Sequence, residues 1–205
     1  MLKLISILTL IIICGIAGAQ PIDPDPDGMS FYFDTEGHDW LVIVDPWEPA
    51  YGAGPTIATY LLLTRPSTPF WAVKGWEARF EYETNTFTPP LGLTLTPGAI
   101  DLDDDPDDYV VECDDTALIP ITGDVVVLAS VEFSWLGFEG YAEANIHLYG
   151  VEGSASFPVS PGYISGLGLL TPCHCIFGSW GSVAFVMNEL IRNEGMTWGD
   201  VKSLY

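Results

Sequence analysis

The sequence is poor in basic residues: Lys and Arg together number 6, against 28 Asp and Glu, and the formal net charge is −22 at pH 7. A surface of that sign repels nucleic acid phosphates and anionic lipids, so we expect no nucleic-acid partner. Hydrophobic residues still make up 48% of the chain and aromatic residues 13%. That content is enough for a packed core, so the sequence predicts an acidic folded protein.

Long apolar runs are lacking after the first residues. Lys3 precedes an apolar run over residues 4–13, and small residues follow at 17–19, which is the pattern of a secretory signal peptide. The run is too short to span a bilayer core of about 30 Å. The residue before Cys14 is bulky, which disfavours lipid attachment there. We expect residues 1–19 to be removed and the mature chain, without an integral membrane segment, to be extracellular or at the cell surface.

Catalytic motifs are also lacking. The sequence contains no His-Glu-x-x-His, no Gly-x-Ser-x-Gly, no phosphate-binding glycine loop and no dinucleotide fingerprint. Glu77, Glu81 and Glu83 share one strand face, which keeps a two-carboxylate glycoside hydrolase as an alternative. Arg79 alternates with them, as on an ordinary solvated face. The sequence predicts a protein that is not an enzyme and has no catalytic residues.

Three cysteines, an odd number, follow the predicted signal peptide. In an oxidising compartment we expect a disulfide from Cys113 to either Cys173 or Cys175. The alternative is a metal site formed by Cys173, His174 and Cys175. Neighbouring residues of an extended chain point to opposite sides, which disfavours that site.

The dominant hydrophobic period is two, the period of half-buried strands. Residues 76–83 alternate apolar with charged side chains, and residues 125–135 repeat the pattern. Residues 40–44 and 60–63 are apolar on both faces, as expected of central strands. Proline and glycine separate the segments. We expect further strands at Phe31–Asp34, Trp40–Val44, Thr56–Thr64, Tyr109–Cys113, Asn145–Tyr149, Ile164–Leu170 and Ser182–Met187.

These strands predict an all-β fold, a two-sheet antiparallel sandwich over residues 31–187. An acidic, Pro-rich linker at 20–30 precedes it, and a helical tail at 188–205 follows. Thr197 resembles a helix N-cap, and Trp198, Val201 and Tyr205 then share one helical face.

Acidic residues are concentrated at 101–115. Five of them occupy positions 1, 3, 5, 7 and 12 of a calcium-loop template: Asp101, Asp103, Asp105, Asp107 and Glu112. Pro106 stands where the template has glycine, and no helices flank the loop. A calcium site is therefore one hypothesis for these residues, and a solvated acidic loop is the other. Calcium is the one cofactor that the sequence indicates.

Seven tryptophans raise the possibility of a carbohydrate-binding module, because sugars stack on exposed aromatic rings. Trp76 and Trp135 belong to apolar strand faces and are expected in the core. Trp47 and Trp71 lie at loops or strand edges and are the better ligand-binding candidates.

Residues 56–149 resemble the bacterial cohesin-like β-sandwich family. The resemblance rests on the apolar strand Thr56–Thr64, on Lys74-Gly75-Trp76-Glu77-Ala78-Arg79-Phe80-Glu81-Tyr82-Glu83, and on Asp124-Val125-Val126-Val127-Leu128-Ala129-Ser130-Val131-Glu132-Phe133. It implies a nine-stranded jelly-roll-like sandwich that binds an extracellular protein; an Ig-like sandwich is the other form the strands allow.

The last nine residues resemble a Trp-Gly-x-Val-Lys-x-Leu-Tyr tail of small secreted proteins of environmental bacteria. That resemblance implies a sorting or attachment signal in which Thr197, Trp198, Val201, Lys202 and Tyr205 take part; a helix that packs on the sandwich is the other interpretation. Together the sequence predicts a secreted sandwich that binds a protein, matrix or polysaccharide partner, or is a structural component at the cell surface.

Overall fold

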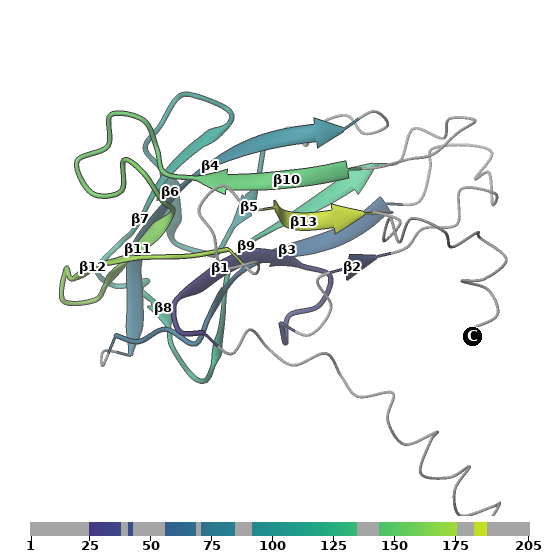
Figure 1. The fold of residues 1–205 in the computed structure, drawn as a ribbon. Coiled ribbons are helices and arrows are strands. Elements are labelled where there is room, and N and C mark those ends of the chain that lie inside the picture. Colours follow the sequence, from purple (N-terminus) through teal and green to yellow (C-terminus); the bar gives the residue numbers. More distant parts are fainter. Residues whose placement is uncertain are drawn as a thin grey trace, which may run out of the picture.

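Two β-sheets pack face to face in a sandwich (Figure 1). The computed structural model describes residues 25–37, 41–42, 56–68, 71–84, 92–134, 144–175 and 183–187. The smaller sheet has the strand order β1 (Gly28–Tyr32), β3 (Thr56–Thr64), β9 (Val125–Ser134) and β5 (Thr94–Leu95). The larger sheet has nine strands, and its main path is β12 (Leu170–Pro172), β11 (Gly162–Ser165), β4 (Ala72–Thr84), β10 (Ala144–Tyr149), β13 (Val183–Met187) and β2 (Leu41–Val42). Three more strands complete it: β6 (Ala99–Asp101), β7 (Asp108–Cys113) and β8 (Ile119–Pro120).

The strand pairs are antiparallel except for β13 with β2 and an isolated bridge between Gly28 and His174. Every regular element in the described ranges is a strand. The predicted all-β, two-sheet antiparallel sandwich is therefore confirmed. The predicted C-terminal helix lies outside the described residues.

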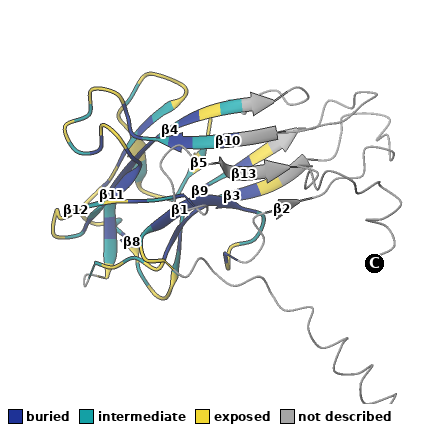
Figure 2. Cartoon of the chain, viewed as in Figure 1, coloured by how far each residue is buried: buried dark blue, intermediate teal, exposed yellow. Residues whose placement is uncertain are grey.

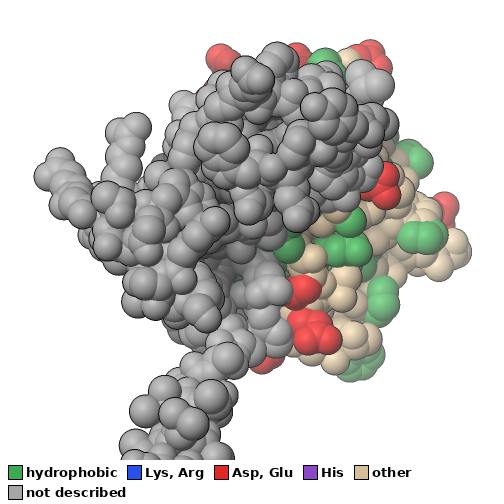
Figure 3. Space-filling model, turned by 90° about the vertical axis from the view of Figure 1, so that its right-hand side faces the viewer, with side chains coloured by type: hydrophobic (Ala, Val, Ile, Leu, Met, Phe, Trp, Pro, Cys, Tyr) green, Lys and Arg blue, Asp and Glu red, His purple; other side chains and the backbone are tan. Residues whose placement is uncertain are grey.

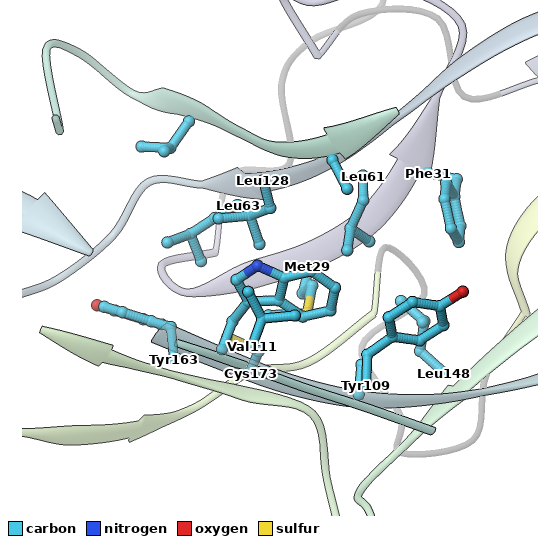
Figure 4. Packing of buried hydrophobic residues seen from close by; sticks show 14 of the residues in the cluster. Met29, Phe31, Leu61, Leu63, Tyr109, Val111, Leu128, Leu148, Tyr163 and Cys173 are labelled. Carbon is cyan, nitrogen blue, oxygen red and sulfur yellow. The ribbon is translucent and has the colours of Figure 1, made fainter. Parts of the chain in front are cut away.

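The core lies between the two sheets, where the inward side chains of β4 meet those of the smaller sheet (Figures 2 and 4). Trp76 is fully buried and stacks on Tyr109 of β7, with ring centroids 6.0 Å apart. Phe80 packs against Phe31 of β1 at 5.4 Å. Burying a side chain of this size contributes about 1.5–3 kcal/mol, so these rings are a main source of stability.

Strand β4 is the longest strand and has neighbours along both edges. On one edge β10 pairs with Arg79–Thr84 and β11 with Val73–Glu77, so β10 and β11 lie end to end with loop 150–161 between them. On the other edge β7 pairs with Gly75–Arg79 and β8 with Ala72–Val73. Strand β4 therefore pairs directly with four strands of the larger sheet: β7, β8, β10 and β11.

A β-bulge interrupts β4 near its start. Ile164 pairs with Gly75 and the next residue, Ser165, pairs with Val73, which leaves Lys74 without a partner on β11. A Cβ atom on Gly75 would lie 2.5 Å from the carbonyl oxygen of Val111. Only glycine fits there, because a backbone carbonyl of the paired strand cannot rotate away.

The structure corrects several predicted boundaries. Residues 164–170 form two strands joined by a turn, not one strand, because Ser165 N–H bonds to Leu169 O and the chain reverses at Gly168, whose φ is +79°. Strand β2, expected to be central, is the last strand of its sheet path. Strand β1 begins at Gly28, inside the segment expected to be a linker. Strand β3 has the bounds that were predicted.

The remaining segments expected from sequence lie outside the described residues: the signal peptide at 1–19, Trp47, and the tail residues Thr197, Trp198, Val201, Lys202 and Tyr205. Where the structure describes the chain, no helix has the length and apolar character needed to cross a bilayer.

Candidate functional site

On the outer face of the larger sheet, the strand register aligns residues in two adjacent rows. Each row takes one residue from each of five neighbouring strands or from the residue that continues a strand. The first row is Ile100, Glu112, Gly75, Ile164 and Leu170. The second row is Leu102, Val110, Glu77, Gly162 and Pro172, in which Leu102 joins through its N–H bond to Val110 O at 2.9 Å.

Apolar side chains at the β6–β7 side of these rows are open to solvent. Ile100 is 59% exposed and Leu102 is 55% exposed, and Val110 between them is half-buried. We call these three residues the outer strip. Large aliphatic side chains are seldom this exposed side by side on a regular sheet without a binding role, so the outer strip is a candidate docking surface.

Loop 150–161 covers part of the second row. Glu77 was predicted to be solvent-exposed, but this loop buries it to 5% exposure, and Ser154 Oγ donates a hydrogen bond to its carboxylate. Phe157 of the loop packs so closely on the sheet that a Cβ at Gly162 would lie 2.3 Å from its ring. The outward carboxylates of β4 are therefore not equivalent: Glu81 is exposed and Glu77 is enclosed.

Arg79, next on the same face, is surrounded by partners. Its guanidinium contacts Glu81 at 3.1 Å and Glu152 at 3.9 Å, and it lies 5.3 Å from the centre of the Tyr149 ring. Glu77 and Glu81 do not share an open cleft, because the first is covered. A pair of carboxylates flanking an accessible bond, which a glycoside hydrolase needs, is not formed by these residues.

The acidic loop between β6 and β7 is folded on itself. Asp101 Oδ1 accepts the N–H of Asp103 at 3.2 Å and of Val110 at 3.0 Å, while Asp103 and Asp105 accept the N–H groups two residues further on. These carboxylates thus stabilise a turn, a use typical of Asp in loops.

The strand register separates two of the five residues of the calcium-loop template. Asp101 pairs with Val111 and Ile100 pairs with Glu112, so Asp101 and Glu112 project from opposite faces of the same hairpin. The first and twelfth residues of the template therefore do not face each other in this structure. Among the described residues no group of three or more His, Cys, Asp or Glu side chains is placed to hold a metal.

A cavity of about 240 Å³ lies beside this loop. Leu93, Leu95 and Tyr109 line it together with Asp101 and the aspartates at 103–105. Burial raises the pKa of the Tyr109 hydroxyl, which accepts the Leu93 N–H at 3.1 Å. Tyr109 is therefore a neutral side chain, and the lining of the cavity combines apolar with acidic residues.

The predicted disulfide is also corrected, because all three thiols are free and buried. Cys113 ends β7, whereas Cys173 follows β12 and Cys175 lies beside Leu148 of β10, so both possible partners are on the far side of β4. Strands β7 and β12 are separated by three spacings, about 14 Å, and a disulfide requires Cα atoms within about 7 Å.

The two thiols on either side of His174 are held in the protonated form by burial. Burial raises the pKa of Cys175 to about 12 and that of Cys173 well above its ordinary value, which keeps both protonated near neutral pH. His174 between them is half-buried while they are fully buried, as expected for side chains that alternate along an extended segment.

Trp71 is 85% exposed, just before β4 begins. The hydrogen bond from Gly166 N to Ala72 O, 2.9 Å, joins the residue after Trp71 to the turn between β11 and β12, which carries the exposed Leu167. Trp71 therefore stays a candidate ligand-binding residue.

Cohesin modules are among the solved structures to which the chain is similar. The sixth cohesin of scaffoldin B from Acetivibrio cellulolyticus, solved in complex with a dockerin, is 11% identical over 80% of this chain and 99% of that one, with a TM-score of 0.44. A type II cohesin domain from the cellulosome of the same organism is 11% identical over 80% and 96%, with a TM-score of 0.45. The cohesin module of a family 33 glycoside hydrolase from Clostridium perfringens is 12% identical over 72% and 91%, with a TM-score of 0.40.

Cohesin is also the family that the sequence resemblance named. No family model and no curated protein matches the sequence. With identities and TM-scores this low, the function has to be argued from the residues of this chain.

Proposed function

We propose that this chain is an exported, non-catalytic protein-binding module whose partner docks on the outer strip. The observation that carries the proposal is the exposure of Ile100 and Leu102, 59% and 55%, on β6 and the residue after it, which are hydrogen-bonded to β7. Apolar side chains on a preorganised sheet lose little conformational freedom on binding, which is what a specific interface needs. The sequence resemblance to cohesins, which bind extracellular proteins, supports the same function.

The charge around the outer strip indicates which kind of partner can bind there. Glu112 shares the first row, and the aspartates at 103–105 and 107 follow Leu102 in the adjoining loop. The acidic character is not confined to this region: on the described part of the face drawn in Figure 3, carboxylates (red) and hydrophobic side chains (green) are visible, and no Lys or Arg (blue). A partner with an apolar ridge flanked by Lys or Arg complements this surface in shape and charge.

Affinity capture with matched variants tests the proposal. The mature chain is immobilised and exposed to culture medium and surface extract of the source organism, alongside Ile100→Asp/Leu102→Asp and the control Val159→Asp. Val159 is equally exposed, at 58%, but lies on loop 150–161. We expect a captured protein that the double variant loses and the control retains. Its purified form should bind with an affinity that falls as salt rises.

Three results would contradict the proposal: equal capture by all three proteins, no capture by any, or binding to a glycan array with no protein partner. The last result would favour a carbohydrate-binding module. Loss of glycan binding on Trp47→Ala or Trp71→Ala would then assign the site.

Retention at the cell surface is a separate part of the proposal and involves the tail. If Thr197, Trp198, Val201, Lys202 and Tyr205 form a sorting signal, deletion of residues 196–205 releases the protein into the medium. Truncated protein that still sediments with the cells would show that the tail has no such role.

A further inference from the structure

One end of the sandwich is built from segments without a single charged residue. Residues 66–68 and 71–73 precede and begin β4, residues 117–123 surround β8, and residues 165–172 form the β11–β12 turn. Two hydrogen bonds join these segments: Ile121 N donates to Trp71 O at 2.7 Å and Gly166 N to Ala72 O at 2.9 Å. We call them together the uncharged end. The one carboxylate bound to these segments by a hydrogen bond among the described residues is that of Asp27, which accepts the Ser67 N–H at 2.7 Å and the Tyr163 hydroxyl at 2.8 Å.

The uncharged end also carries most of the strongly exposed apolar side chains. Trp71 is 85% exposed, Leu167 65%, and Leu169 and Leu170 52% each, and these are four of the seven large exposed hydrophobic side chains in the described part of the chain. An apolar cluster of this kind on a soluble protein marks an interaction surface.

The turn that presents the leucines is rigid. Leu169 N donates to Ser165 Oγ at 3.1 Å and Gly168 N to Ser165 O at 2.8 Å, while Ser165 N donates to Leu169 O at 2.9 Å. Gly168 supplies the positive φ, +79°, that closes the turn. Because the backbone of the turn is already fixed, little backbone entropy is lost when a partner covers the leucines.

The charge distribution indicates which partner can use this end. The acidic loop 102–107 starts beside Val110, which pairs with Glu77, and ends beside Arg79. These positions are five and seven residues along β4 from Ala72, which corresponds to roughly 17 Å and 23 Å. At the rim of the uncharged end Lys74 pairs with Asp115 at 3.1 Å, and Arg65 lies next to Asp124 through a backbone hydrogen bond. A second copy of this acidic chain is repelled by most of the surface of the first copy. It can approach at the uncharged end.

We propose that this chain self-associates end to end, with Trp71 of one protomer packed on Leu167 and Leu169 of the other across a two-fold axis. This arrangement holds the two acidic loops roughly 33–46 Å apart, several times the Debye length of about 8 Å at physiological salt. The apolar area offered by these side chains is below the ~800 Å² per partner of a stable complex, so the dimer is weak and concentration-dependent.

Sedimentation velocity of the mature chain over micromolar to millimolar concentrations, in 20 mM and 500 mM NaCl, tests this. We expect a monomer–dimer equilibrium that shifts severalfold toward dimer at high salt, because screening removes the repulsion between the acidic bodies. Leu167→Asp should weaken the dimer at least tenfold. The control Val159→Asp, a residue 58% exposed elsewhere, should leave it unchanged, and both variants should melt at the wild-type temperature.

A wild-type chain that stays monomeric at millimolar concentration and high salt would overturn the proposal, as would equal weakening by Val159→Asp. Zwitterionic phosphatidylcholine vesicles provide a third arm. If the monomer binds them and Leu167→Asp does not, the surface serves a lipid membrane and the proposal is wrong. Dimerisation that survives Ile100→Asp/Leu102→Asp separates this end from the outer strip.

Discussion

The two faces of β4 differ in what covers them. On the inner face Trp76, Ala78 and Phe80 are all buried against the smaller sheet. On the outer face Glu77 is buried beneath loop 150–161 while Glu81, four residues further on, is exposed. Burial on the inner face follows from the alternation of the strand itself, whereas burial on the outer face depends on a distant segment of the chain.

This difference decides which residues can serve in binding. A face that is buried by its own sheet partner has only a structural role, since nothing else can reach it. A face that is covered in patches retains open areas, and their position depends on where the loop ends. On this sheet the loop leaves the outer strip open, and that is why we place the docking surface at β6 and β7.

Among the substitutions that test the difference between the two faces of β4, Trp76→Ala should have the largest effect on stability. Trp76 is fully buried and stacks on Tyr109, so its removal leaves a cavity in the core and should lower the free energy of unfolding by about 3–5 kcal/mol. The outer-face variant Glu81→Ala should change it by no more than about 0.5 kcal/mol, because an exposed ion pair contributes little. Urea denaturation followed by circular dichroism measures both. Similar losses for the two variants would mean that the two faces are not distinct.

Ser154→Ala tests the covered part of the outer face and should have a smaller effect. The substitution removes the hydroxyl that donates to the Glu77 carboxylate and that accepts the N–H groups of Ser156 and Phe157. A buried carboxylate without its donor costs about 1–3 kcal/mol of stability. Hydrogen exchange of the amides in loop 150–161 should accelerate while that of β4 stays slow.

Ser156→Ala is the matched control, since it alters a half-buried serine of the same loop whose backbone N–H donates to Ser154 Oγ at 3.0 Å and is kept in the variant. An equal loss in Ser156→Ala would show that the loop responds to any change. Unaltered exchange in Ser154→Ala would show that the contact with Glu77 does not hold the loop.

The sequence allowed the inner face to be predicted because alternation is a local property. Strand β3 was predicted at its observed bounds, and the inward residues Trp76, Phe80 and Val131 all lie in the core. The pattern was misleading at residues 164–170, where apolar residues suggested one strand. The glycines at 166 and 168 allow a turn there, and the periodicity of the side chains does not reveal it.

The outer face could not be predicted to the same extent, because its properties depend on pairing between distant segments. The calcium template counts positions along the chain, yet the register of β6 with β7 puts Asp101 and Glu112 on opposite faces. Likewise nothing in the sequence of loop 150–161 indicates that Ser154 meets Glu77, 77 residues away. The exposure of Ile100 and Leu102 was missed for the same reason. The signal available was a pair of apolar residues flanking Asp101, at the start of the acidic run.

The smallest expected effect concerns pH and the edge of the outer face, at Asp108. Partial burial and the negative charges of Asp105, Asp103 and Asp107 raise the pKa of Asp108, and Arg79 opposes them. A carboxyl whose pKa is higher in the folded than in the unfolded state destabilises the fold when ionised. That cost is present above the folded-state pKa and disappears as the pH falls below the unfolded value, near 3.8.

Asp108→Asn should therefore stabilise the protein at pH 7, by less than about 1 kcal/mol because solvent screens the site, and should have no effect near pH 3. Asp114 is the matched opposite: hydrogen bonds from Thr116 lower its pKa, so it contributes stability above pH 3.8 that is lost as the pH falls through its folded-state pKa. Asp114→Asn should destabilise at pH 7 and be neutral at low pH. Urea titrations of both variants at pH 3 and pH 7 measure the two signs. The same sign for both would mean that local contacts do not set these pKa values, and that the net negative charge of the whole chain dominates its response to pH.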